Sequence, residues 1–203
     1  MDIKTLIFDF GNVVGFFDHR LTTRRLVRYS TLSAETLHAN LFASELEDDY
    51  EAGRLTSAEF VQEIRRVCLL DCTDEVIATA WADIFAPNPD ICDLIPRLKP
   101  HYRLLLGSNT NELHSLHFLK QFESTLGLFD AIVLSYAVGA RKPQAAFFQH
   151  CVKGAGCEPS QCVFIDDLEA NVAGARACGL HGIVYKGLKD LQGELHRLGV
   201  RFQ

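Results

Sequence analysis

The residues best suited to chemistry in this chain occur in four short polar groups, each close to the end of an apolar run. They combine carboxylates, a hydroxyl with an amide, and an amine: Asp9, Ser108 with Asn109, Lys142, and Asp166 with Asp167. The first group lies in the stretch IFDFGNVV, where a strand-like run ends on a carboxylate and turns at once through Gly11 and Asn12. These residues form one catalytic set only if the fold brings them together.

Three carboxylates in one place favour a metal ion. Crowded carboxylates repel one another, so their pKa values rise. A hard cation such as Mg²⁺ relieves this repulsion because it prefers oxygen ligands. With the cation bound, a remaining carboxylate can attack phosphorus as a nucleophile. A serine hydroxyl, backbone N–H groups and a lysine ammonium can hold the other phosphate oxygens. The set therefore suits phosphoryl transfer through an aspartyl-phosphate.

Each group also has an ordinary structural explanation. An aspartate after a strand is common as a turn former or a helix cap. Lys142 precedes Pro143 and can be a solvated surface lysine, and Asp166 with Asp167 can cap the helical pattern that follows. The functional interpretation rests on all four groups occurring together, each near a predicted strand end.

Alternating strand and helix patterns place the groups on one edge of a sheet. Short buried runs predict strands over 3–9, 102–108, 129–135, 161–167 and 181–186. Helical patterns follow over 90–99, 112–122, 143–156, 169–180 and 189–199. This alternation is typical of a parallel sheet with helices on both faces. Ligands of such sheets bind beyond the carboxyl ends of the strands.

Residues 19–86 interrupt the alternation with helical patterns and no convincing strand. The segment is too long for a simple connection. We therefore predict an α/β fold with a Rossmann-like core, residues 1–16 and 87–203. A small all-α cap, residues 17–86, is predicted to be inserted after the first strand.

Composition excludes several classes of protein. The 203 residues carry a net charge of -6, which argues against a nucleic-acid partner and against anionic membranes. No apolar run has the roughly 20 residues that span a bilayer, and we expect no signal peptide at MDIKTLIFDF. The seven cysteines are irregularly spaced, which favours reduced thiols in a cytoplasmic protein. We expect a monomer.

The four motifs together resemble the haloacid dehalogenase-like hydrolase superfamily. The stretches IFDFGNVV, LLLGSNTN, ARKPQ and VFIDDLEANVAGARACG match its four motifs in order, and the likeness covers essentially the whole chain. The chain is most similar to the phosphatase branch with a small helical cap. This branch includes sugar-phosphate phosphatases that read FDLGNV and the phosphatase domain of soluble epoxide hydrolase. YEAGRLTSAEF resembles the corresponding cap segment of that branch.

The resemblance implies a Mg²⁺-dependent phosphatase that acts on a small phosphorylated metabolite, with a sugar phosphate as one candidate. It implies that Asp9 is the nucleophile and a metal ligand, and that Gly11 offers its carbonyl to the metal. Ser108 and Asn109 would hold phosphoryl oxygens, and Lys142 would pair with Asp9 and the phosphate. It further implies that Asp167 binds the metal directly, with Asp166 close by or linked through water. Asn171 is a weaker candidate for supporting this pair.

Gly11 departs from the family pattern. Most phosphatases of the family carry an aspartate two residues after the nucleophile, which protonates the leaving oxygen and then activates water. General acid–base catalysis is worth roughly 10²–10⁴-fold. The leaving group could depart unprotonated, the cap could supply a substitute such as Asp18 or His19, or the protein could bind phosphorylated ligands with little turnover. Gly11 alone favours the first explanation.

Other residues have mainly structural interpretations. His114 and His117 lack a third metal ligand, so we expect them at the surface or its boundary. Phe16, Phe17 and Trp81 could line the cap side of the pocket or pack in the core of the cap, and core packing is favoured. A metal-independent haloacid dehalogenase and a low-turnover binding protein are the alternative functions. Asp166 and Asp167 argue against the dehalogenase, because without a cation they would repel an anionic substrate.

Overall fold

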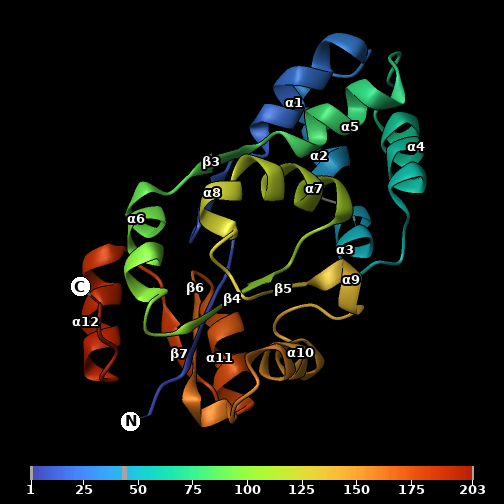
Figure 1. Ribbon diagram of the computed structural model, residues 1–203. Helices are drawn as coiled ribbons and strands as arrows, with labels where there is room; N and C mark the ends of the chain where they lie inside the picture. Colours follow the sequence, from blue (N-terminus) through green and yellow to red (C-terminus); the bar gives the residue numbers. More distant parts are fainter. Residues whose placement is uncertain (1, 43–44, 203) are drawn as a thin grey trace.

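The computed structural model describes residues 2–42 and 45–202, and a five-stranded parallel sheet forms its centre (Figure 1). The strands lie in the order β5-β4-β1-β6-β7, so β1 is the middle strand. Their bounds are β1 (Thr5–Phe8), β4 (Arg103–Ser108), β5 (Ala131–Leu134), β6 (Cys162–Asp166) and β7 (His181–Val184). Each of these five strands falls within a run that the sequence predicts, and the predicted fold class is confirmed.

Both faces of the sheet are buried, because neighbouring side chains of a strand point to opposite faces. Leu6 and Phe8 of β1 belong to one apolar cluster, whereas Ile7 between them belongs to another. In the paired strand β4, Leu104 and Leu106 lie opposite Leu6 and Phe8 and join the same cluster. This double burial explains why the strands read as continuous apolar runs.

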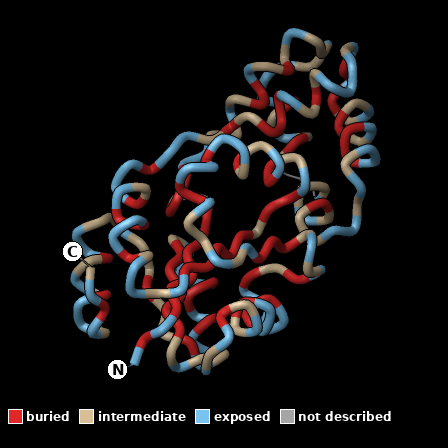
Figure 2. The backbone as a smooth tube through the Cα atoms, viewed as in Figure 1, coloured by how far each residue is buried: buried red, intermediate tan, exposed pale blue. Residues whose placement is uncertain are grey.

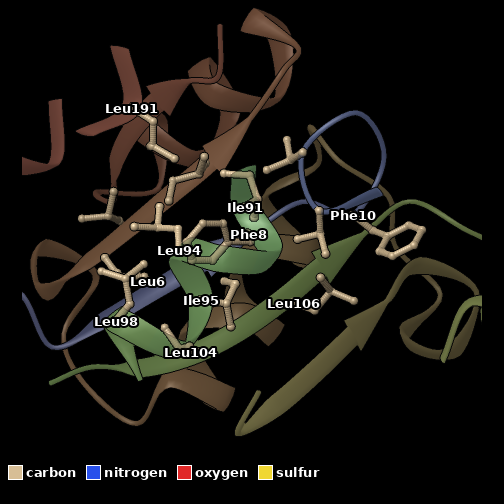
Figure 3. Close-up of a cluster of buried hydrophobic side chains, with 14 of the residues drawn as sticks. Leu6, Phe8, Phe10, Ile91, Leu94, Ile95, Leu98, Leu104, Leu106 and Leu191 are labelled. Carbon is tan, nitrogen blue, oxygen red and sulfur yellow. The ribbon is translucent and has the colours of Figure 1, made fainter. Parts of the chain in front are cut away.

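Helices cover both faces of the sheet. On one face the apolar cluster includes residues of α6 (Pro89–Leu98), α7 (Glu112–Gln121), α8 (Glu123–Leu126) and α12 (Leu188–Arg197). Figure 3 shows Ile91, Leu94 and Ile95 of α6 packed against Leu6 and Phe8. The other face carries α10 (Ala145–Ala155) and α11 (Glu169–Ala177). These two layers hold the strand ends, and hence the predicted site, in fixed positions.

A separate helical layer lies beside the sheet, at the upper right of Figure 1. It consists of α1 (Arg20–Leu26), a 3-10 turn (Val27–Tyr29), α2 (Ala34–Phe42), α3 (Leu46–Glu51), α4 (Ser57–Val67) and α5 (Asp74–Ala82). Its helices pack around their own apolar cluster, which includes Tyr50, Phe60 and Trp81. We call α1–α5 the helical layer below. An antiparallel pair, β2 (Gly15–Phe17) and β3 (Phe85–Pro87), joins it to the sheet.

Several short elements escape sequence prediction, among them β2, α8 and the three described next. Helix α3 has the sequence LEDDYE, whose run of acidic residues hides any apolar period. Strand β3 begins at Phe85, although no strand is predicted within 19–86. Its three residues are too few to show the alternation of apolar and polar side chains that predicts a strand. Helix α9 (Ser135–Val138) is a single turn directly after β5. All three lie at or near the boundary between the sheet and the helical layer.

Figure 2 shows the buried residues concentrated along the sheet and inside the helical layer.

Helix boundaries follow ordinary capping chemistry. The Thr56 side chain accepts a hydrogen bond from the Glu59 N–H, and the Glu59 carboxylate accepts one from the Thr56 N–H, which together begin α4. Within residues 2–42 and 45–202, no helix is long and apolar enough to cross a membrane.

Candidate active site at the carboxyl ends of the strands

Asp9 follows the middle strand and is held at both its backbone and its side chain. Its N–H donates a 2.8 Å hydrogen bond to the Ile165 carbonyl, which extends the pairing of β1 with β6. Its carboxylate Oδ1 accepts a 2.7 Å bond from the Phe10 N–H. The chain then turns through Asn12, which has a positive φ of 56°. Asparagine tolerates this left-handed conformation better than most residues, so GN suits the turn that presents Asp9.

Lys142 connects two of the predicted carboxylates. Its Nζ lies 2.6 Å from Asp9 Oδ1 and 2.8 Å from Asp166 Oδ2, and all three side chains are buried. Asn109 fixes the lysine backbone, because its side chain accepts from the Lys142 N–H at 2.8 Å and donates to the Lys142 carbonyl at 3.1 Å. The four motifs therefore meet, and Asn109 has an anchoring contact that sequence reasoning did not anticipate.

The two aspartates after β6 differ in their surroundings. Asp166 is fully buried and accepts hydrogen bonds from the Leu168 N–H at 2.9 Å and from the Asn171 side chain at 3.0 and 3.1 Å. Asn171 therefore contacts Asp166, which agrees with its predicted supporting role. Asp167 is less enclosed and accepts a 3.1 Å bond from the Asn12 side chain. Asp167 therefore keeps more of its acceptor capacity for a further ligand.

Burial and mutual repulsion dominate the electrostatics. Burial raises the pKa of Asp9 to about 7, opposed by Lys142 and reinforced by the charges of Asp166 and Asp167. Burial also raises the pKa of Asp167, opposed by the Asn12 hydrogen bond. For Lys142, burial favours the neutral amine, but the Asp9 and Asp166 carboxylates outweigh it and raise its pKa. One ammonium thus faces three carboxylates.

This donor set fits a hard divalent cation. Asp9, Asp166 and Asp167 each offer a carboxylate oxygen, and these three oxygens lie within 4.8 Å of one another. Oxygen donors with few protein carboxylates and room for water or phosphate are what Mg²⁺ prefers. Lys142 neutralises only part of the negative charge of the cluster. The residues present therefore suit a Mg²⁺ ion.

A pocket of about 200 Å³ opens beside the cluster, between the strand ends and the helical layer. The core contributes Gly11, Ser108, Asn109 and Thr110 to its lining, and Ser108 is almost fully buried. The opposite wall comprises His19 and three acidic residues of α3, namely Glu47, Asp48 and Glu51. Arg141 lies between the two walls. Phe17 also lines the pocket and is 39% exposed, so the favoured core packing is wrong for this residue and the alternative position beside the pocket is correct.

The remaining sequence candidates separate clearly. Asp18 is partly exposed, pairs with Arg24 and accepts a hydrogen bond from the Arg20 N–H at the start of α1. It lies outside the pocket lining. His114 is buried, so its expected surface position is wrong. Burial is tolerated because both ring nitrogens have polar partners, the Trp81 carbonyl and the Asn111 amide, each at 3.0 Å. Burial lowers the pKa of His114 to about 3.

Three more residues that the sequence analysis considered lie outside the pocket. His117 lies 3.3 Å from Asp83 at the edge of the helical layer. Trp81 packs in the core of that layer, as expected. Phe16 is 45% exposed, so its expected core packing is also wrong. None of these side chains lines the pocket.

Sequence reasoning missed the acidic wall and its partner. Glu47 and Glu51 lie in an acidic stretch that reads as a solvated segment, and nothing local indicates that it faces the strand ends. Arg141 precedes Lys142 in the motif ARKPQ, and this adjacency was the one available signal. Its guanidinium lies 2.8 Å from Asp48 and 2.7 Å from Glu51, so it ties α3 to the core loop that carries Lys142.

Comparison with known proteins agrees with this geometry. The chain is 27% identical over 177 residues to a D-ribitol-5-phosphate phosphatase of Bacteroides thetaiotaomicron, covering 84% of this chain and 85% of that protein. It is 25% identical to a sesquiterpene phosphatase of Aspergillus oryzae, covering 89% and 88% of the two chains. A crystal structure of a HAD family enzyme from Bacteroides thetaiotaomicron, in complex with magnesium and inorganic phosphate, superposes with a TM-score of 0.80. That structure is 26% identical, with 91% and 94% coverage.

The family assignment rests on the motifs, the fold and a match to a family model. The haloacid dehalogenase-like hydrolase model matches residues 3–179, which include all four motifs and the helical layer. The chain therefore belongs to the haloacid dehalogenase-like hydrolase family.

Proposed function

We propose that this protein is a Mg²⁺-dependent phosphatase that hydrolyses a small phosphorylated metabolite through an aspartyl-phosphate on Asp9. The observation that carries the proposal is the buried Lys142 ammonium, 2.6 Å from Asp9 and 2.8 Å from Asp166, beside a third carboxylate. This arrangement suits a phosphate better than an uncharged substrate, since cation and ammonium together would neutralise its oxygens. The phosphatase relatives support it.

Each predicted residue has a role consistent with its position. The Asp9 carboxylate attacks phosphorus, and Lys142 orients it and binds a phosphoryl oxygen. Ser108 and Asn109 line the pocket next to Asp9 and would bind the other phosphoryl oxygens. Asp9, the Gly11 carbonyl and Asp167 would hold Mg²⁺, with Asp166 close by. When bound, Mg²⁺ supplies positive charge that stabilises the transferring phosphoryl group.

The pocket and the relatives bear on the substrate. A volume of about 200 Å³ suits a small leaving group, and one phosphatase relative acts on D-ribitol 5-phosphate by its name. We therefore propose a small phosphorylated polyol or sugar rather than a macromolecule. The expectations of no nucleic-acid partner, of a monomer and of a cytoplasmic protein stay predictions.

We also keep the division into core and cap as a proposal. The predicted boundaries, residues 16–17 and 86–87, lie side by side because Phe16 pairs with Ala86 and Gly15 with Pro87. A two-stranded connection of this kind would let residues 17–86 move as one body over the site. Such motion would admit substrate and then exclude water.

The test is phosphate release from sugar phosphates, polyol phosphates, acetyl phosphate and p-nitrophenyl phosphate. We expect turnover that EDTA abolishes and Mg²⁺ restores. Asp9→Asn should lower kcat by more than about 10³-fold, because an amide cannot serve as the nucleophile. Asp18→Asn, at an exposed carboxylate near the same loop, is the matched control and should retain activity. Turnover that survives EDTA, or dehalogenation of a 2-haloacid, would overturn the proposal in favour of the metal-independent alternative.

A further inference from the structure

The first observation concerns the space beside Gly11. A Cβ built on Gly11 would lie 3.0 Å from Cε1 and 3.4 Å from Cδ1 of the Phe17 ring. The ring therefore lies in tight contact with the place where a side chain at position 11 would begin, and a side chain there would require the ring to shift by a few tenths of an ångström. Glycine itself carries no proton donor. Any proton donor for the leaving group must reach the pocket from another direction.

The acidic wall on α3 supplies candidates, and most of their polar groups are already engaged. Asp48 and Glu51 both pair with Arg141, at 2.8 and 2.7 Å. The ring of His114 is bonded through both nitrogens to buried protein groups. Glu47 differs, because among the described residues its carboxylate makes one close polar contact, with His19 Nε2 at 3.9 Å. That separation exceeds a hydrogen bond.

Helix α3 is anchored so that Glu47 faces the pocket. Glu47 and Glu51 are one helical turn apart and share a face of the helix. The Glu51 carbonyl accepts a 2.7 Å hydrogen bond from the Ser135 hydroxyl of the core, while its carboxylate meets Arg141. At the end of the same segment, Gly53 packs so closely on Tyr136 that a Cβ would lie 2.5 Å from the Tyr136 carbonyl oxygen. The Glu47 side chain, 19% exposed, lines the pocket shared with Gly11 and Ser108.

We propose that Glu47 is the general acid and base of the reaction, taking the place of the carboxylate that position 11 lacks. This proposal rests on the proposed function and names a further catalytic residue for it. It favours a substitute from the helical layer as the explanation of Gly11, but through Glu47 instead of Asp18 or His19.

The two half-reactions balance with this residue. In the first, an Asp9 oxygen forms a bond to phosphorus, the bond from phosphorus to the leaving oxygen breaks, and the Glu47 carboxyl proton moves to that oxygen. In the second, the Glu47 carboxylate takes a proton from water as the water oxygen bonds to phosphorus. The bond between phosphorus and Asp9 then breaks, which returns the Asp9 carboxylate and the Glu47 acid and releases phosphate.

The environment of Glu47 supports the acid form at neutral pH. Burial raises its pKa to about 8, and the neighbouring charges of Glu51 and Asp48 add to this effect. Arg141 opposes the shift, and His19 is the other titratable group facing the carboxyl. A general acid works best when its pKa lies near the operating pH.

The experiment compares kcat/KM of the wild type and Glu47→Gln on two esters, an alkyl phosphate such as ribitol 5-phosphate and the activated ester acetyl phosphate. We expect kcat/KM on the alkyl ester to fall by about 10²–10⁴-fold. The loss on acetyl phosphate should be much smaller, because its leaving group departs without a proton. Glu47→Asp should recover part of the alkyl-ester activity. Glu75→Gln, the same change at an exposed site on α5, is the matched control.

The wild-type pH profile is a second measurement that needs no variant. On the alkyl ester kcat/KM should fall above about pH 8, and on acetyl phosphate this limb should be weak. An unchanged Glu47→Gln, equal losses on both esters, or wild-type turnover of activated esters alone would overturn the role of Glu47. These outcomes are distinct from failure of the proposed function, in which the wild type releases phosphate from neither ester.

Discussion

The two walls of the pocket solve opposite electrostatic problems. We call the strand-end cluster that lies directly beside the pocket lining the core wall. Its buried charges lie at hydrogen-bond distance, with Lys142 Nζ 2.6 Å from Asp9 and 2.8 Å from Asp166. On the α3 wall, Arg141 pairs with Asp48 and Glu51. Glu47 lies 3.9 Å from His19 Nε2, and burial lowers the pKa of that histidine, which disfavours its charged form. The core wall is therefore tightly paired, and the α3 wall leaves one acid uncommitted.

This difference separates two kinds of work. Binding and attacking a phosphoryl group requires charges fixed in place before the substrate arrives. Transferring a proton requires a group that can gain and lose it, which a fully paired carboxylate does poorly. The core wall, built on strand ends, is suited to the first task. The α3 wall, built on a short helix held by Ser135 and Arg141, is suited to the second.

The strongest way to break the comparison is to remove the charge at the centre of the core wall. Lys142→Met leaves Asp9 and Asp166 buried without their shared partner. Removing one partner of a buried ion pair costs about 3–5 kcal/mol, so the free energy of unfolding should fall by that amount in EDTA. Urea denaturation measures it, and phosphatase activity should be lost as well.

The matched control is Lys153→Met, at an exposed position on α10, which should leave stability nearly unchanged. Equal stability of the two variants would contradict the description of the core wall as a tightly paired cluster. A larger stabilisation of Lys142→Met than of the wild type by Mg²⁺ would agree with a cation that neutralises the same carboxylates.

The second prediction loosens the α3 wall from the core. Arg141→Met removes both ion pairs to α3, and we expect KM to rise with a loss of about 1 kcal/mol of stability, since the pairs are partly exposed. Arg66→Met removes an ion pair between exposed neighbours within α4 and should change stability by less than about 0.5 kcal/mol. Kinetics and thermal unfolding of both variants make the comparison, and equal effects would refute the anchoring role of Arg141.

The same contrast explains what the sequence could predict. Asp9 directly follows β1 and Asp166 ends β6, and parallel strand ends share one edge of the sheet, so the meeting of these two carboxylates was predictable. Lys142 lies further along, in the loop after β5 and α9, and its motif was the signal that placed it at the same edge. The role of Asn109 in fixing Lys142 was not, because it depends on loop backbones that approach one another across the fold.

The α3 wall lies beyond local patterns altogether. Glu47 is one acid among several in LEDDYE, and six residues are too few for a helical period to emerge. Its position depends on how α3 docks on Ser135 and Arg141, which lie about 90 residues further along the chain. Likewise, the sequence shows that position 11 lacks an acid, but only the structure shows how closely the Phe17 ring lies beside it.

The pH dependence of stability tests the cost of keeping Glu47 unpaired. Its pKa is about 8 in the folded protein, against 4.5 when unperturbed, so the folded state holds a proton that the unfolded state releases between these values. Stability should therefore decline as pH rises through this window. Glu47→Gln removes the ionisation, so its Tm relative to wild type should be higher at pH 8.5 than at pH 5, by roughly 2–4 °C for each 1 kcal/mol. Glu75→Gln should show no such trend. If Glu47→Gln gains stability at high pH while it loses alkyl-ester turnover, Glu47 is retained for chemistry and not for folding. If the Tm difference is constant with pH, the Glu47 carboxyl is already solvated or paired, which contradicts the prediction.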